Sequence, residues 1–173
     1  MNIDWPKFVE IVREHRTFLL TSHIRPDCDA LGSELGMAGV LDALGKEVLI
    51  VNGQATPPNL AFIDPHRRIL ALGRDLAVGE LPRTDVLMIL DTSAWAQLGP
   101  MADVVRSSTS RKIVVDHHVS EDDLQALAFK DRQVEATGRL VLEAARQLDV
   151  TLTPQIAVSL FAAIATDTGW FRF

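Results

Sequence analysis

The chain has 173 residues, of which 47% are hydrophobic and 23% are charged, as in one soluble α/β domain with a buried core. Its net charge of −6 disfavours a protein that coats nucleic acid, because such proteins contact phosphate through Lys and Arg. The net charge is compatible with an acidic enzyme whose bound cations contact the phosphate. One cysteine, a charged N-terminus and short apolar runs argue against a disulfide framework, a signal peptide and a membrane span. We therefore expect a cytoplasmic protein.

Helical and extended patterns alternate along the chain. Apolar residues at helical spacing predict a helix over residues 3–16, and a short apolar run predicts a buried strand at 17–21. A helix with several small residues should begin near Ala30 and end at Gly45, packing closely against a neighbour. Further strands are predicted at 47–51, 68–72, 85–90 and 113–115, and further helices at 134–148 and 154–166. This order indicates an α/β fold: a mainly parallel sheet of about five strands with helices on both faces.

Acidic and histidine side chains gather in four places, each at or near the end of a predicted strand or helix. The groups are His23, Asp27 and Asp29; Asp91; Asp116, His117 and His118; and Asp167. An apolar strand that stops on such a residue brings it to the mouth of the sheet, where several groups together would form a metal site. Oxygen and imidazole ligands without thiolates suit Mn²⁺, Mg²⁺ or Zn²⁺, and the two histidines favour Mn²⁺.

The spacing of these residues is compatible with two cations. Asp27 and Asp29, if splayed in a loop, could serve different ions, and Asp91 could bridge both. His117 and His118 are adjacent, so in extended backbone they point in opposite directions, one to metal and one to substrate. Two cations about 3.5–4 Å apart activate a water and hold the attacked phosphate. The pattern thus points to hydrolysis of phosphate esters.

Each residue taken alone has an ordinary structural explanation. An aspartate such as Asp91 after a strand is often only a helix cap or a turn residue. Cys28 is interpreted as an incidental small residue, and Arg25 as either a phosphate contact or a solvated charge. Ser33 lies near a helix start, where backbone N–H groups could meet an anion. What favours a site is the conjunction of so many potential ligands at element ends.

The four groups resemble the motifs of the DHH phosphoesterases. The resemblance is carried by residues 23–33 (HIRPDCDALGS), 90–92 (LDT), 115–118 (VDHH) and 165–169 (ATDTG), and runs from about Thr17 to Phe173. It is strongest to the branch of nanoRNA-degrading oligoribonucleases that also remove the 3′-phosphate of adenosine 3′,5′-bisphosphate. It implies two Mn²⁺ ions, one held by His23, Asp27 and Asp91, the other by Asp29, Asp91, His117 and Asp167. In the same comparison His118 faces the scissile phosphate and Asp116 supports the site, so both are catalytic candidates. Arg25 and Ser33 are candidate substrate contacts on the separate grounds given above.

The chain also departs from the family pattern. Cys28 stands where the family usually has Gly, and Arg139 stands where an acidic residue is common. The family carries a smaller C-terminal domain whose Gly-rich, His-containing motif grips the substrate, and nothing in this sequence resembles it. The end of the chain, residues 170–173, is apolar and strand-like. We therefore interpret residues 1–173 as a DHH catalytic domain whose substrate-binding domain lies outside this sequence.

The predicted function is two-metal hydrolysis of short oligoribonucleotides, of the 3′-phosphate of adenosine 3′,5′-bisphosphate, or of both. The expected partners are short RNA or nucleotide phosphates, with neither a membrane nor a long duplex. One alternative is an enzyme like the inorganic pyrophosphatases and exopolyphosphatases. Another is a catalytically idle nucleotide-binding regulatory domain, against which the complete ligand set argues.

Overall fold

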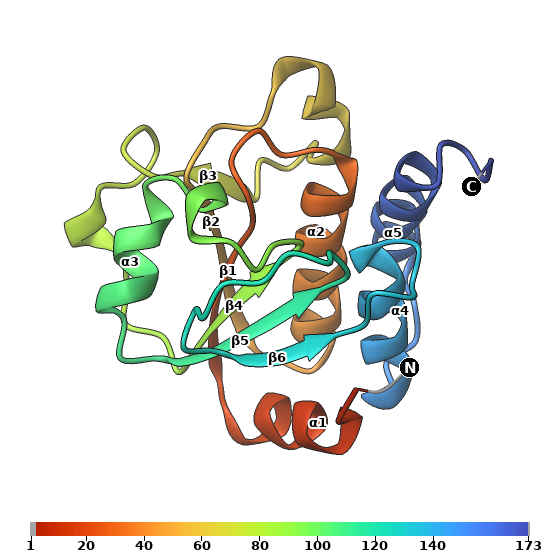
Figure 1. Cartoon of the computed structure of the whole chain (residues 1–173), viewed down its shortest axis with the longest axis horizontal. Coiled ribbons are helices and arrows are strands. Elements are labelled where there is room, and N and C mark those ends of the chain that lie inside the picture. Colours follow the sequence, from red (N-terminus) through yellow and green to blue (C-terminus); the bar gives the residue numbers. More distant parts are fainter. Residues whose placement is uncertain (1–2, 173) are drawn as a thin grey trace.

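A sheet of six parallel strands forms the centre of the protein (Figure 1). The computed structural model describes residues 3–172. The strand order is β3-β2-β1-β4-β5-β6, so the direction in which strands are added reverses between β1 and β4. In open α/β sheets, ligands bind beyond the carboxyl ends of the strands at such a reversal. The strands are Thr17–Thr21 (β1), Glu47–Asn52 (β2), Ile69–Ala71 (β3), Val86–Leu90 (β4), Arg111–Asp116 (β5) and Leu127–Lys130 (β6).

Helices cover both faces of this sheet, as predicted. Helix α2 (Cys28–Ala43), α4 (Thr137–Gln147) and α5 (Pro154–Asp167) lie on one face and share a core with α1 (Trp5–Glu14). Helix α3 (Met101–Ser107) lies on the other face. Successive residues of a strand point to opposite faces, so Leu20 and Met88 join the first core while Leu19 and Leu87 join the second. None of the helices in the described part of the chain is both long and apolar enough to cross a membrane.

Several boundaries differ from the sequence prediction. Helix α2 begins at Cys28 rather than Ala30, because the Asp27 side chain accepts the Ala30 N–H at 3.0 Å and caps the helix two residues earlier. Helix α4 begins at Thr137 rather than at residue 134, and α3 and β6 were not predicted.

The end of the chain is not a strand over its described part. Trp170 and Phe171 both have a left-handed backbone, with φ of 62°. The Trp170 N–H donates to the Ala165 carbonyl at 2.6 Å, and the Phe171 N–H donates to the Thr168 hydroxyl at 3.0 Å. These residues therefore turn back onto the last carbonyls of α5 instead of extending. Phe173 lies outside the described residues.

Glycines allow α2 and α5 to pack with their backbones close together. A Cβ atom at Gly32 would lie 2.5 Å from the Ser159 carbonyl oxygen, and one at Gly36 would lie 2.5 Å from Leu160 Cδ2. The close packing predicted from the small residues is thus confirmed. Because the helices run in opposite directions, this contact places the start of α2 beside the end of α5.

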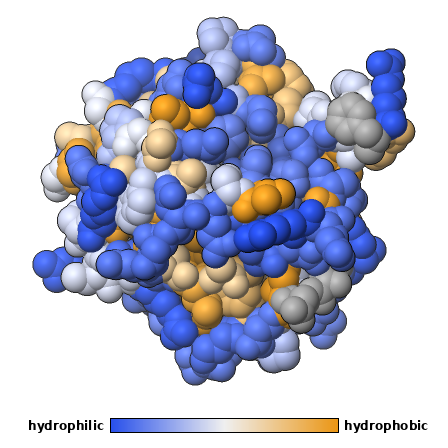
Figure 2. Space-filling model, in the orientation of Figure 1, coloured by the Kyte–Doolittle hydropathy of each residue, from blue (hydrophilic) through white to orange (hydrophobic). Residues whose placement is uncertain are grey.

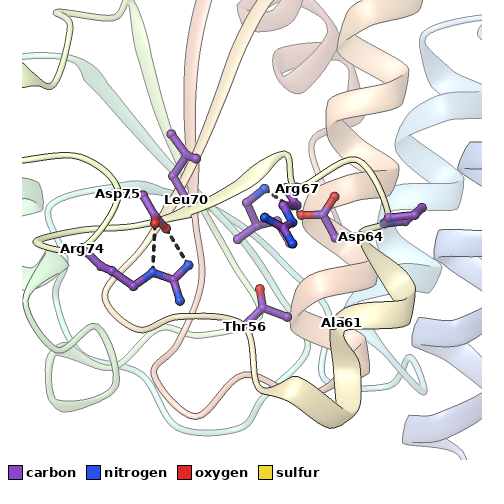
Figure 3. A pocket seen from close by; sticks show the side chains of 9 residues that line it. Thr56, Ala61, Asp64, Arg67, Leu70, Arg74 and Asp75 are labelled. Atoms are coloured by element: carbon purple, nitrogen blue, oxygen red, sulfur yellow. Dashed lines mark hydrogen bonds and ion pairs between the residues drawn. The ribbon is translucent and has the colours of Figure 1, made fainter.

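The edge strand β3 has its outward N–H groups occupied by carboxylates. Asp64 accepts from the Ile69 N–H and Asp75 accepts from the Ala71 N–H, both at 2.9 Å. Figure 3 shows the two carboxylates on either side of Leu70, with Asp75 also paired to Arg74 at 2.7 Å. Asp64 lies in the turn after the 3₁₀ helix η1 (Pro58–Ile63), which follows β2. The surface in Figure 2 is mostly hydrophilic, with scattered apolar patches.

Candidate metal centre

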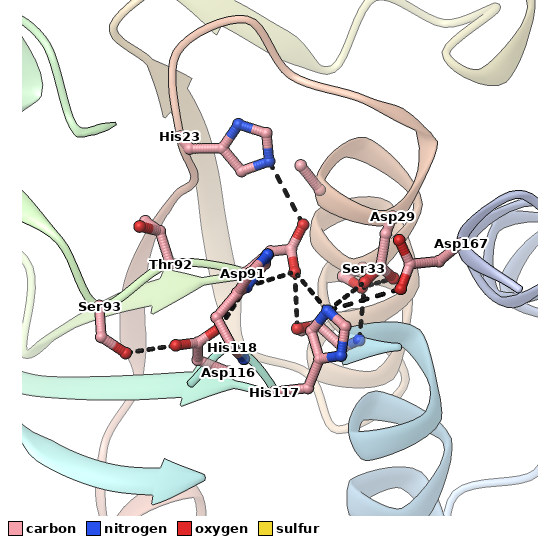
Figure 4. A network of polar contacts seen from close by, with 12 residues as sticks. His23, Asp29, Ser33, Asp91, Thr92, Ser93, Asp116, His117, His118 and Asp167 are labelled. Atoms are coloured by element: carbon pink, nitrogen blue, oxygen red, sulfur yellow. Dashed lines mark hydrogen bonds and ion pairs between the residues drawn. The ribbon is translucent and has the colours of Figure 1, made fainter. Parts of the chain in front are cut away.

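The four predicted groups converge at the carboxyl edge of the sheet (Figure 4). Together they form an acid–histidine cluster, which consists of His23, Asp27, Asp29, Asp91, Asp116, His117, His118 and Asp167. Three triads in it have ligand-capable atoms within 4.8 Å of one another: His23, Asp27 and Asp91; Asp29, His117 and Asp167; and Asp91, His117 and His118. The convergence follows from the fold, because β1, β4 and β5 are parallel neighbours and the α2–α5 contact adds one carboxylate from each helix.

Asp91 occupies the middle of the cluster. Its side chain is 1% exposed, with one carboxylate oxygen 3.3 Å from His23 Nε2 and the other 3.7 Å from His117 Nε2. The Thr137 hydroxyl donates to that second oxygen at 2.8 Å. The Asp91 backbone is left-handed, with φ of 61°, a conformation that Asp adopts more readily than most residues. Asp91 thus lies between two imidazoles, as a shared ligand must.

The two imidazoles whose Nε2 atoms face Asp91 have a fixed orientation. His23 Nδ1 lies 2.9 Å from the Ile24 carbonyl oxygen, and His117 Nδ1 lies 3.3 Å from the Val134 carbonyl oxygen. A carbonyl oxygen only accepts, so Nδ1 must carry the proton in each bond. Nε2 is then the nitrogen that faces the carboxylates, and its lone pair becomes available to a cation when the ring is neutral. This is the arrangement that metal-binding histidines use, and the donor set of the cluster therefore fits divalent cations.

The start of α4 holds Asp29 in place. Asp29 is 1% exposed and accepts the N–H groups of Thr137 at 2.7 Å and Gly138 at 2.9 Å. Asp29 Oδ2 lies 3.7 Å from His117 Nε2, which is itself 3.5 Å from Asp167 Oδ2. Thr137 thus supports both Asp29 and Asp91, a role that its position in the sequence did not reveal.

A second network holds His118. Asp116 is fully buried, and its Oδ1 lies 2.8 Å from His118 Nδ1. Asp116 Oδ2 lies 2.9 Å from Lys130 Nζ and also accepts from the Ser93 hydroxyl. Burial alone would raise the pKa of Asp116, but the hydrogen bonds from His118, Ser93 and Lys130 outweigh it and hold the pKa well below its ordinary range. The hydrogen bond to Asp116 in turn raises the pKa of His118. Sequence reasoning found neither Lys130 nor Ser93.

The carboxylates of the cluster carry more negative charge than the neighbouring histidines and hydrogen-bond donors offset. Burial raises the pKa of Asp91 well above its ordinary value, and the charge of Asp29 adds to this, against the hydrogen bond from His23. The pKa of Asp167 is also raised, by burial and then by Asp29. Burial alone would lower the pKa of His23. Its hydrogen bonds, first of all the one to Asp91, and the nearby negative charges outweigh burial and raise the pKa to about 9. A bound cation would offset this excess of negative charge.

Other predicted residues lie at the margin of the cluster. The Asp27 side chain is 62% exposed, with Oδ1 3.9 Å from His23 Nε2. Arg25 is exposed, and its backbone N–H donates to Gln54. Ser33 is fully buried and donates to Asp29 at 3.2 Å, so a substrate contact there would have to replace that bond. Cys28 is buried and belongs to none of the three triads.

Residues 17–164 match the DHH family, N-terminal domain. The chain belongs to the DHH family. It is 33% identical over 156 residues to the bifunctional oligoribonuclease and PAP phosphatase NrnA of Thermus thermophilus, covering 89% of this chain and 44% of the relative. It is 28% identical over 155 residues to a probable manganese-dependent inorganic pyrophosphatase of Deinococcus radiodurans, covering 87% of this chain and 46% of that relative.

A solved structure has the same fold over nearly the whole chain. An exopolyphosphatase-related protein from Bacteroides fragilis superposes with a TM-score of 0.89 at 27% identity, covering 98% of this chain and 51% of that protein. This DHH-family chain therefore spans about half the length of the relatives that it matches. The resemblance found in the sequence motifs is confirmed at the level of the family.

Proposed function

We propose that this chain is the catalytic part of a metal-dependent phosphoesterase that hydrolyses short oligoribonucleotides and the 3′-phosphate of adenosine 3′,5′-bisphosphate. The observation that carries the proposal is the position of buried Asp91 between the Nε2 atoms of His23 and His117. The substrate class is supported by the similarity to NrnA of Thermus thermophilus. Because the chain spans about half of such relatives, we further propose that a separate substrate-binding domain completes the site.

The proposed ligands divide into two sets that share Asp91. One cation would be held by His23, Asp27 and Asp91, and a second by Asp29, Asp91, His117 and Asp167. Divalent cations there, Mn²⁺ by preference or Mg²⁺, would act as Lewis acids and lower the pKa of water. The preference for Mn²⁺ is supported by the two imidazoles and by the manganese-dependent relative.

His118 is the proposed proton donor to the leaving oxygen. Its Nδ1 is occupied by Asp116, and its side chain is 42% exposed, so the rest of the ring can meet a ligand at the cluster. The contact with Asp116 raises the pKa of His118 and keeps the ring protonated to a higher pH. A positioned donor of this kind contributes about 10²–10⁴-fold in rate.

A second candidate function is hydrolysis of inorganic pyrophosphate or polyphosphate. It is favoured by the likeness to the Deinococcus radiodurans pyrophosphatase and to the Bacteroides fragilis protein. Both functions use the same cations and differ in the group attached to the phosphate. A catalytically idle binding domain would instead bind nucleotide without turnover.

The test is a comparison of three substrates with the Mn²⁺-loaded full-length protein, which includes the proposed substrate-binding domain: a diribonucleotide, adenosine 3′,5′-bisphosphate and pyrophosphate. We expect hydrolysis of the first two, and a loss of about 10²–10⁴-fold in kcat for His118→Ala with unchanged Mn²⁺ binding by calorimetry. His66→Ala, an exposed histidine outside the cluster, is the matched control. Turnover of pyrophosphate alone would favour the second candidate, and cation binding without any turnover would favour the idle domain.

A further inference from the structure

A cavity of about 440 Å³ opens beside the acid–histidine cluster. Its walls come from the start of α2, from η1 and the loop before it, and from the end of α5. Two of the lining side chains, Asp27 and Asp167, belong to the cluster, one to each of the two proposed cation sites. A phosphate at the cluster would therefore have the group attached to it next to this cavity.

We propose that this cavity binds the nucleobase of the substrate, with a preference for adenine. The inference rests on the proposed function and names the part of the protein that would recognise the nucleoside. The volume falls within the range of small-molecule pockets, about 300–1,000 Å³. The cavity therefore has room for a base and part of its ribose.

The wall of the cavity combines apolar faces with one amide. Pro26, Pro57 and Leu60 line it with rings and methyl groups, which suit the flat face of a base. Asn59 adds a side-chain amide, which offers one donor and one acceptor side by side. An Asn amide matches adenine in a bidentate way, because its N–H donates to N7 and its oxygen accepts from the N6 amino group. The pairing is the physical reason for the adenine preference.

The Asn59 side chain is available for this contact. It is exposed, and its amide makes no hydrogen bond among the described residues. Its backbone is held by η1, where the Leu60 N–H donates to the Pro57 carbonyl at 2.9 Å. The hydroxyl of Thr166, also in the wall, instead donates to the Ala162 carbonyl at 2.8 Å within α5. Asn59 is thus the polar group of the wall best placed to read a base edge.

Charge explains why the base and the phosphate would occupy different parts of the surface. Asp27 and Asp167 line the cavity and would repel a phosphate that lacked cations. A neutral base meets no such repulsion. We therefore expect the base contact to add affinity to a cation-held phosphate, and adenosine without phosphate to bind more weakly than AMP.

The test is a binding measurement that does not need turnover. The ¹⁵N-labelled chain is titrated with AMP and with ribose 5-phosphate, a matched ligand without a base, in the presence of Mg²⁺, which leaves NMR signals sharp. We expect AMP to bind at least about 5-fold more tightly than ribose 5-phosphate, and the Asn59 side-chain amide resonances to shift with AMP only. Equal affinities, or an unmoved Asn59 signal at AMP saturation, would overturn the proposal.

Variants separate the cavity from the cations. Asn59→Ala should weaken AMP about 5-fold or more and leave ribose 5-phosphate unchanged, whereas Gln155→Ala, an exposed amide outside this cavity, should change neither. Asn59→Asp retains the shape but removes the donor, so it should also lose the adenine preference. If neither phosphate ligand binds with Mg²⁺ or Mn²⁺, the proposed function fails together with the cavity. If both bind equally and the protein still hydrolyses phosphate esters, only the base site fails.

Discussion

Asp116 and Lys130 are register partners on the neighbouring strands β5 and β6, and Asp116 Oδ2 lies 2.9 Å from Lys130 Nζ. Their side chains are 0% and 7% exposed, so the pair is removed from solvent. Lys130 also donates to Ser93 and to the Ser120 carbonyl, which satisfies its remaining protons. The ammonium therefore stabilises the charge of the carboxylate that orients His118.

We predict that Lys130→Met lowers both stability and turnover. Removing one partner of a buried pair leaves the other charge uncompensated, at a cost of about 3–5 kcal/mol. Because Asp116 would then orient His118 less well, kcat should fall about 10-fold or more while Mn²⁺ affinity stays the same. Urea denaturation, steady-state kinetics and calorimetry measure the three quantities. Lys112→Met, on β5 with no ion pair among the described residues, is the control, and an unchanged Lys130 variant would contradict the supporting role.

We predict that Asp91→Asn weakens cation binding and stabilises the metal-free protein. Asn tolerates the left-handed backbone of this position and removes a buried charge that lies near Asp29 and Asp27. For the wild type, Mn²⁺ at 100 times its Kd should stabilise by about 2.7 kcal/mol, roughly 5–10 °C in Tm for this size.

For the Asn variant we expect a higher Tm in EDTA and a much smaller rise with Mn²⁺. Asp103→Asn, whose parent side chain is 90% exposed, should behave like the wild type. A full Mn²⁺-induced rise in the Asp91 variant would rule out its bridging role.

Glu34 predicts a pH dependence of stability. This α2 side chain is fully buried; one carboxylate oxygen accepts from the Asn52 amide at 2.9 Å and the other has no hydrogen-bond partner among the described residues. Burial raises its pKa to about 8, despite the hydrogen bond from Asn52. Because folding raises the pKa of this carboxyl, protonated Glu34 favours the folded state. This contribution to the free energy of unfolding is fully present below about pH 4.5 and is lost as pH rises through about 8.

Glu34→Gln should remove that loss. Relative to the variant, the wild type should lose roughly 1.4 kcal/mol for each pH unit between about 5 and 8. Urea titrations in EDTA at several pH values give the difference, and Glu14→Gln, at the exposed last residue of α1, serves as the comparison. A difference between wild type and Glu34→Gln that does not vary with pH would show that Glu34 is ionised in the folded state.

Gly32→Ala should disturb the helix contact that supports the cluster. The new methyl carbon would lie 2.5 Å from the Ser159 carbonyl oxygen, a backbone atom that can move only if α5 moves. We expect a loss of about 1–3 kcal/mol and weaker Mn²⁺ binding, because Asp167 at the end of α5 would shift from Asp29. Gly79→Ala, which meets no heavy atom within 4 Å, is the control. Equal stability of the two variants would mean that the α2–α5 packing tolerates the added carbon.

The sequence was most informative where an apolar strand stopped on a polar residue. Asp91 and Asp116 stand at such ends, and parallel strands carry these ends to the same edge of the sheet. The supporting residues were not found, because their contacts cross long sequence separations: Ser93 lies 23 positions from Asp116, and Thr137 lies 46 from Asp91. Lysine, serine and threonine also occur widely on protein surfaces, so their types alone pointed to no site.

Short, partly exposed segments were the other source of error. Strand β6 has four residues, two of them exposed, so it lacks the continuous apolar run that identified β4. Conversely, Trp170 and Phe171 looked strand-like from their apolar composition, yet they have a left-handed backbone and are 65% and 64% exposed. Apolar composition predicts burial only where another element covers the residue, and that information lies in the tertiary structure.

The carboxylates along β3 also affect how these molecules meet one another. An exposed strand edge recruits strands from other chains through its free N–H groups, which is a common start of aggregation. At β3 the outward N–H groups of Ile69 and Ala71 are already bonded to Asp64 and Asp75, and an incoming strand would have to displace two charged acceptors. Growth of the sheet from one molecule to the next is therefore opposed at this edge, and the protection comes from two residues that take no part in the acid–histidine cluster.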